Sequence, residues 1–264
     1  MKALHLYIYA VILMTLNTSC EKVILIELNE ADQKIVVDAI VSNDSVQNYV
    51  IISQSGGFYQ DNDFEAISGA SVTITDDAGV VYSLNESAPG YYSDSNLIGK
   101  LKTNYDLEVV LNDQTITAST YLPDTTHIDS LSYFLNSGSF GDPEWFVLMH
   151  WSDKQSEENF YRFKPTINGE KGKQISILDD LLINGVETQY PLFDVTVEDF
   201  DTLMIEFIEI DQGTYEYFKV LGEIASGANA TSAAPGNPES NLVGNALGFF
   251  GAYAITNASI VIEP

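Results

Sequence analysis

The chain contains few cysteines and few basic residues, and each shortage excludes a class of protein. Cys20 is the single cysteine among 264 residues, so no disulfide can form within the fold. Only 11 Lys and Arg residues stand against 38 Asp and Glu residues, which gives a formal net charge of -27. Such a surface repels the phosphate backbone of nucleic acids. We therefore expect no nucleic-acid partner.

Residues with catalytic potential are also scarce. Beyond the N-terminal segment the chain offers only His127 and His150, and neither belongs to a G-x-S-x-G or H-E-x-x-H arrangement. Two histidines more than 20 residues apart give no support for a zinc site. The abundant carboxylates make chance pairs common, so no single pair indicates a glycosidase. We therefore expect a protein that is not an enzyme.

One glycine-rich stretch superficially resembles a phosphate loop. In "GNALGFFG" (244–251) no Lys or Ser follows the last glycine, and apolar residues fill the gaps between the glycines. We expect instead that the glycines allow tight turns while Leu247, Phe249 and Phe250 pack into the C-terminal half of the protein.

No hydrophobic run is long enough for a good transmembrane helix. The run "LHLYIYAVILMTL" (4–16) follows Lys2 and would span about 20 Å as a helix, short of the roughly 30 Å hydrocarbon core. A basic residue, an apolar run and a short polar segment are typical of an export signal. Thr18-Ser19-Cys20 is similar to a bacterial lipobox, in which cleavage occurs before the cysteine and acyl chains are attached to it. We predict a signal peptide over 1–19, lipidation of Cys20 and a tether over 20–33.

From residue 34 onward the pattern is that of strands. In "GASVTITDDAGVVYSL" (69–84) apolar and polar residues alternate on both sides of a turn, which predicts a hairpin. Six or seven such short strands predict an Ig-like antiparallel β-sandwich over 34–125. A β-rich C-terminal domain follows over 126–264, with a central strand at 201–210. It includes one amphipathic helix at 214–227 that Thr214 can cap. The fold class is therefore mainly β.

Four segments in order carry a resemblance to a known family. They are the lipobox-like Cys20, "IVVDAIVSN" (35–43), "ISGASVTITDDAGVVYSLNESAPGYY" (67–92) and "APGNPESNLVGNALGFFGAY" (234–253). Together they resemble the DUF4249 family of Bacteroidota lipoproteins over nearly the whole mature chain. The resemblance implies an outer-membrane, lipid-anchored protein, often associated with TonB-dependent transporters. It supplies no catalytic residues.

Two groups of residues are candidates for binding. Asp61, Asp63 and Glu65 form an alternating set of oxygen donors that could hold Ca²⁺, although the loop lacks the glycine and the distant glutamate of an EF-hand. A solvated acidic loop is the alternative, and we expect no other cofactor. Aromatic residues that could contact a partner flank this loop and the Gly-rich stretch 135–145, where core packing explains them equally well. They are Phe58, Tyr59, Phe64, Tyr133 and Phe140.

Three functions are compatible with these features. The first is a non-enzymatic outer-membrane lipoprotein, fixed to the membrane through acyl chains on Cys20, that serves a TonB-dependent transporter by binding the transporter or its ligand. The second is an adhesion or envelope-scaffolding module. The third is a hydrolase of surface polysaccharides or peptides that would use Asp and Glu residues in a cleft. The sequence does not say whether the protein faces the periplasm or the exterior.

Overall fold

The computed structural model describes residues 33–56, 64–136, 143–155, 157–226 and 237–264, and within these ranges the chain is mainly β, as predicted. Most strands belong to one large sheet. Its N-terminal strands are β1 (Ile35–Ser42), β2 (Tyr49–Gln54), β3 (Ser71–Asp76), β4 (Val81–Ala88), β5 (Tyr91–Ser93), β6 (Thr103–Leu111) and β7 (Gln114–Leu122). Its later strands are β10 (Phe160–Ile167), β11 (Glu170–Lys171), β12 (Ser176–Asp179), β14 (Thr202–Ile210) and β15 (Ala246–Val261).

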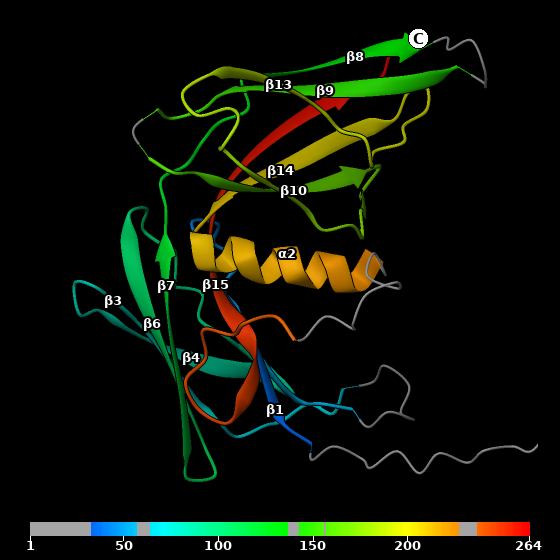
Figure 1. Cartoon of the computed structure of the whole chain (residues 1–264). Helices are drawn as coiled ribbons and strands as arrows, with labels where there is room; N and C mark the ends of the chain where they lie inside the picture. The colour runs from blue at the N-terminus through cyan, green and yellow to red at the C-terminus, as the bar shows by residue number, and fades with distance from the viewer. Residues whose placement is uncertain (1–32, 57–63, 137–142, 156, 227–236) are drawn as a thin grey trace, which may run out of the picture. The chain divides into compact units, whose positions relative to one another are not determined.

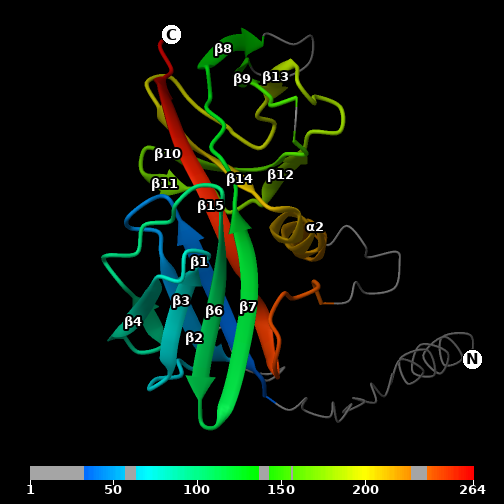
Figure 2. The same ribbon diagram turned by 90° about the vertical axis from the view of Figure 1, so that its left-hand side faces the viewer.

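The strand order shows how this sheet is built (Figures 1 and 2). It runs β11-β10-β14-β15-β1-β2-β5-β4-β3-β6-β7, with β12 beside β10. A separate three-stranded sheet contains β13 (Glu187–Pro191), β9 (Glu144–Ser152) and β8 (Ser130–Asn136), in that order. The one helix in the described ranges is α2 (Gln212–Ser226).

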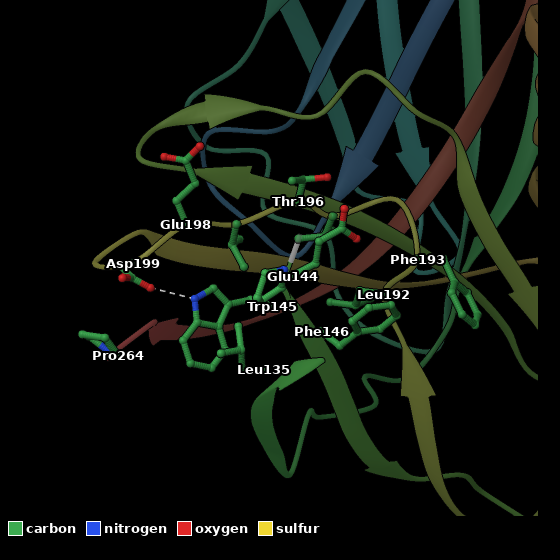
Figure 3. Close-up of a pocket in the computed structure, with 13 residues that line it drawn as sticks. Leu135, Glu144, Trp145, Phe146, Leu192, Phe193, Thr196, Glu198, Asp199 and Pro264 are labelled. Carbon is green, nitrogen blue, oxygen red and sulfur yellow. Dashed lines mark hydrogen bonds between the residues drawn. The ribbon is translucent and has the colours of Figure 1, made fainter. Parts of the chain in front are cut away.

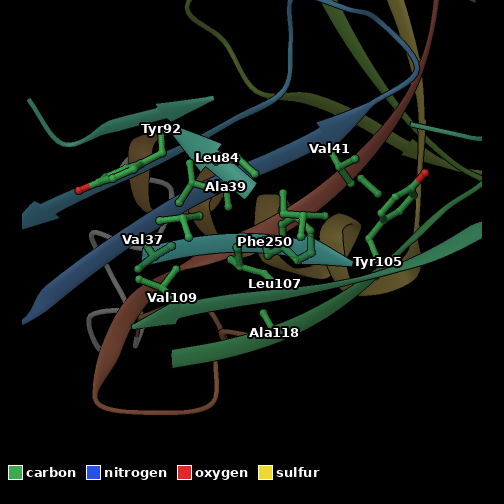
Figure 4. Packing of buried hydrophobic residues seen from close by; sticks show 14 of the residues in the cluster. Val37, Ala39, Val41, Leu84, Tyr92, Tyr105, Leu107, Val109, Ala118 and Phe250 are labelled. Atoms are coloured by element: carbon green, nitrogen blue, oxygen red, sulfur yellow. The ribbon is translucent and has the colours of Figure 1, made fainter. Parts of the chain in front are cut away.

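The N-terminal strands form a sandwich around one apolar core (Figure 4). Side chains at alternate positions of β1 point inward, as the two-residue period of a strand requires, and they meet alternate side chains of β6 across the core. The predicted hairpin is confirmed, since β3 pairs with β4 through a turn in which Gly79 has a φ of 81°. The core needs no disulfide because its central side chains are completely buried: Val37, Val41, Ile52, Ile74, Tyr105, Val109 and Phe250.

The long strand β15 corrects the prediction made for "GNALGFFG". Gly248, Phe249 and Phe250 do not form tight turns; they lie within β15, which runs parallel to β1 with Val37 opposite Gly248. Phe250 is buried in the N-terminal core, whereas Phe249 stacks on Tyr217 of α2 with 4.5 Å between ring centroids. A parallel pairing requires a long connection between the strands, and here nearly the whole chain supplies it.

The three-stranded sheet packs on β10, β14 and the C-terminal half of β15 around Trp151. This side chain is completely buried and contacts the rings of Tyr161 and Phe207, with centroid distances of 5.9 and 5.4 Å. The predicted position of residues 201–210 is confirmed, because β14 lies between β10 and β15. Its apolar side chains are buried on both faces, as expected for a central strand.

Helix α2 begins earlier than predicted and has a different cap. The carboxylate of Asp211 accepts a hydrogen bond from the Thr214 backbone nitrogen at 2.7 Å, which is the geometry of an N-cap. Thr214 itself is buried in the first turn of the helix. The helix lies across β15 (Figure 1) and covers a small apolar cluster that includes Phe160, Ile208 and Tyr253.

The C-terminal strand also contributes to the N-terminal core. Leu242, Phe250 and Ala252 are buried with the side chains of β1 to β7, while the later residues of β15 pair with β14. The range 34–125 therefore does not fill its core alone, and residues 33–264 form one compact unit. The division at residue 125 stays a prediction.

Candidate functional site

An open hollow of about 750 Å³ lies at one end of the three-stranded sheet (Figure 3). Three pieces of chain surround it: the end of β8, the start of β9 and the segment 192–199 that follows β13. Strand pairing brings these pieces together, because Leu135 lies opposite Trp145 and Pro191 lies opposite Leu148. A hollow of this size is within the range of small-molecule and peptide sites.

Trp145 is fixed at the base of this hollow. Alternation along β9 points its side chain the same way as the buried Val147 and Met149, but its position near the strand end leaves the ring partly open. The indole nitrogen donates to an Asp199 carboxylate oxygen at 2.8 Å, and the Tyr133 ring packs edge-on at 5.3 Å. Both contacts hold the indole plane in one orientation.

The hollow also carries apolar side chains that are exposed. Phe193 is 74% exposed, which is unusual for so large an apolar side chain. Phe146 stacks on the half-exposed Phe134 with 5.8 Å between ring centroids, on the face of the sheet opposite Trp145. Aromatic side chains that are held rigidly and left uncovered are the typical anchors of protein and peptide contacts.

The charged residues that line the hollow have one sign. Glu144, Glu198 and Asp199 are acidic, and none of the 13 lining residues is Lys, Arg or His. An anionic ligand would therefore be repelled, whereas an apolar surface with basic groups at its edge would be attracted.

The predicted binding residues do not form one site. Tyr133 supports Trp145 behind the hollow, but the exposed Phe64 and Glu65 lie beside β2, where the Glu65 carbonyl accepts a hydrogen bond from the Gln54 nitrogen. Six further predicted residues lie outside the described ranges: Cys20, Phe58, Tyr59, Asp61, Asp63 and Phe140. The calcium prediction therefore stays a prediction. The sequence reasoning missed Phe193 and Asp199, whose only signal is the apolar and acidic stretch "PLFDVTVEDF" (191–200).

A serine and a histidine are paired on the other face of β9. The hydroxyl of Ser132 lies 2.7 Å from Nε2 of His150, and both side chains are partly buried. In the described part of the chain no carboxylate bonds to the second ring nitrogen, which is the contact that orients the histidine of a catalytic triad. Within the described residues the pair therefore joins β8 to β9 without the third group of a triad.

The described residues contain neither a grouped set of metal ligands nor a helix suited to cross a membrane. No three His, Cys, Asp or Glu side chains within these ranges are grouped so that they could hold a metal ion. No helix within them has the length and apolar character needed to cross a membrane.

The fold and the hollow define a mainly β, sandwich-like protein with an open aromatic surface. The chain belongs to the DUF4249 family, a domain of unknown function, whose family model matches residues 21–259. No curated protein matches the chain in sequence.

Proposed function

We propose that this protein is a lipid-anchored, non-enzymatic binding protein of the bacterial outer membrane that serves a TonB-dependent transporter. Acyl chains on Cys20 would hold it at the membrane, and the hollow around Trp145 would contact the transporter. The main support for the transporter contact is the exposed Phe193 in this hollow, because an uncovered aromatic side chain is a typical anchor for a protein partner.

Two observations support the membrane anchor. Thr18-Ser19-Cys20 follows an apolar run, as in a lipobox. The family match begins at residue 21, directly after Cys20, which is compatible with cleavage before this cysteine. Two or three acyl chains contribute roughly 0.8 kcal/mol for each buried methylene, which is sufficient for stable attachment.

The anchor is tested by replacing Cys20 with serine. We expect Cys20→Ser to abolish incorporation of labelled palmitate and to remove the protein from the outer-membrane fraction, because no thiol is left to carry lipid. Ser19→Ala keeps a small residue before the cysteine and should leave both readouts unchanged. Equal palmitate labelling of Cys20→Ser and the unchanged protein would exclude lipidation at this residue.

The partner surface is tested by crosslinking in the native membrane followed by mild detergent extraction. We expect an outer-membrane β-barrel to co-purify, and Phe193→Ser to reduce its yield about tenfold or more, as for a central anchor of an interface. Leu182→Ser is the matched control, since Leu182 is 91% exposed and does not line the hollow. Both substitutions are at the surface and should leave the folding stability within about 0.5 kcal/mol.

Other outcomes would select another function. Isolation only as a free monomer would contradict the transporter proposal. Retention of host or matrix material without a transporter would instead indicate the adhesion or scaffolding module.

A further inference from the structure

A second hollow, of about 320 Å³, lies beneath α2 and shares no lining residue with the first. Its floor is formed by the outer faces of β1 and β15, one wall by β10, and its cover by α2. The alternation of side chains between the two faces of a strand explains why charged residues line this hollow. The residues between the inward-pointing core positions face outward here, and they include Asp38 of β1 and Arg162 and Lys164 of β10.

Arg162 is the only arginine in the chain, and it forms no ion pair with the residues that the structure describes. Its Nη1 donates to the Tyr253 hydroxyl at 2.8 Å, and the guanidinium lies 3.8 Å above the centre of the Phe218 ring. Its Nε is buried and has no hydrogen-bond partner. The described carboxylates all lie beyond 4.0 Å from this guanidinium, in a protein with 38 acidic residues. A half-buried guanidinium without a carboxylate partner among the described residues is suited to bind a carboxylate ligand.

Lys164 adds a second positive charge on the same face of β10. Glu206 is the one carboxylate within 4.0 Å of its ammonium among the described residues, and the ammonium lies 5.0 Å from the centre of the Tyr253 ring. Burial, together with the neighbouring charge of Arg162, lowers the pKa of Lys164 to about 8. Partial removal of these two cations from water is unfavourable, and a bound anion would offset that effect.

Asp38 provides the opposite charge across the hollow. Asp38 keeps part of its surface exposed, but neighbouring atoms remove water from its carboxylate and raise its pKa, while the charges of Arg162 and Lys164 act in the opposite direction. Aromatic rings of Tyr49, Tyr217 and Phe249 complete the lining. The hollow therefore combines two cations, one anion and an apolar aromatic wall.

We propose that this hollow binds a small zwitterion, namely a free α-amino acid or a short peptide. Its carboxylate lies at Arg162 and Lys164, its ammonium lies at Asp38, and its side chain packs on the aromatic wall. The protein as a whole carries a formal charge of -27 and would repel a polyanion. A zwitterion has no net charge and is not repelled in this way. Binding of such a ligand does not depend on the transporter contact.

The probe is glycyl-phenylalanine, titrated calorimetrically into the full-length protein in detergent. We expect saturable binding, with affinity about tenfold or more lower for the C-terminal amide and for the N-acetyl form, because each lacks one charged group. Inorganic phosphate should not bind. Equal affinity for the free dipeptide and its amide, or no saturable binding of the dipeptide, would overturn the proposal.

Variants assign the charges. Arg162→Gln should lower the affinity for the dipeptide about tenfold or more, whereas Lys173→Gln, an exposed position outside the hollow, should leave it unchanged. Asp38→Asn should remove the difference between the free and N-acetylated dipeptides. If Arg162→Gln does not fold, the amide and N-acetyl comparisons on the unchanged protein still decide the outcome. An effect of Lys173→Gln as large as that of Arg162→Gln would contradict the assignment.

The pH dependence provides a further readout. Lys164 is faced by Arg162 on its own strand, Glu206 on β14, Lys171 on β11, Asp38 on β1 and Tyr253 on β15. It loses its charge as the pH rises through about 8, so the affinity for a carboxylate should fall between pH 7 and pH 9. Lys164→Arg keeps the charge and should show a smaller fall, while the titration of the ligand amine is the same in both proteins. Identical pH profiles would exclude Lys164 from the site.

Discussion

Replacement of Gly248 by alanine is expected to destabilise the protein by about 4 kcal/mol or more, a large part of the roughly 5–15 kcal/mol that holds a typical domain folded. A Cβ atom at this position would lie 1.9 Å from the carbonyl oxygen of Val37 on the paired strand, and 2.8 Å from its carbonyl carbon. Because the obstacle is backbone, β1 and β15 would have to separate. Gly248 also has a φ of 109°, which L-amino acids with a side chain rarely adopt.

The matched control is Gly79→Ala. Gly79 also has a positive φ, 81°, but a Cβ atom there meets no other atom within 4 Å. Gly79→Ala should lower the free energy of unfolding by about 1–2 kcal/mol, which is the conformational penalty alone. Urea denaturation of both variants measures the difference. Equal losses would show that the close approach between β15 and β1 is not what requires glycine at position 248.

Lys154→Met is expected to destabilise the protein by about 3–5 kcal/mol at neutral pH, because it leaves a buried carboxylate without its counterion. The Glu209 side chain is only 2% exposed, and the Lys154 ammonium donates to its two oxygens at 2.9 and 3.2 Å. Thr126 and Asn159 donate further hydrogen bonds at 2.6 and 2.8 Å. These bonds join β14 to the segments before β8 and β10, so the carboxylate is a junction of the C-terminal half.

The loss should depend on pH in a defined direction. Burial raises the pKa of Glu209 above its ordinary 4.5, against the effect of its hydrogen bonds with Thr126, Lys154 and Asn159. The folded state therefore binds the proton more tightly than the unfolded state does, and this stabilisation is lost as the pH rises through the folded pKa. Without Lys154 that pKa rises further.

Denaturation of Lys154→Met should consequently show a small loss near pH 4, where Glu209 is protonated, and the full loss near pH 8. Lys102→Met is the control, since Lys102 pairs with Asp124 at the surface and should contribute about 1 kcal/mol or less. If the loss in Lys154→Met is the same at both pH values, it comes from packing of the lysine stem and not from the uncompensated charge.

Features set by neighbouring residues could be predicted from the sequence. The hairpin of β3 and β4 follows from alternation and a glycine that tolerates a positive φ, and the buried face of β9 follows from the spacing of Val147, Met149 and Trp151. The helix was predicted correctly, but the residue predicted to cap it, Thr214, was wrong. Both Asp211 and Thr214 can cap a helix, and burial of Thr214 against β15 decided between them.

Features set by distant residues could not be predicted. No local pattern in "GNALGFFG" indicates that Gly248 is needed because another backbone, more than 200 residues earlier, lies against it. The same holds for both hollows. Asp38 and Arg162 are each one polar residue in an alternating strand, and only the order of strands places them on the same face beneath α2.

The parallel pair of β1 and β15 also has a consequence for how the chain reaches its native state. β1, the first strand that the structure describes, pairs with β15, the last one, so the N-terminal sandwich keeps an open edge until synthesis is almost complete. Closing so long a loop is entropically unfavourable and typical of slow folding. Loss of the final twenty residues should therefore harm the folding of the beginning of the chain as well as of its end.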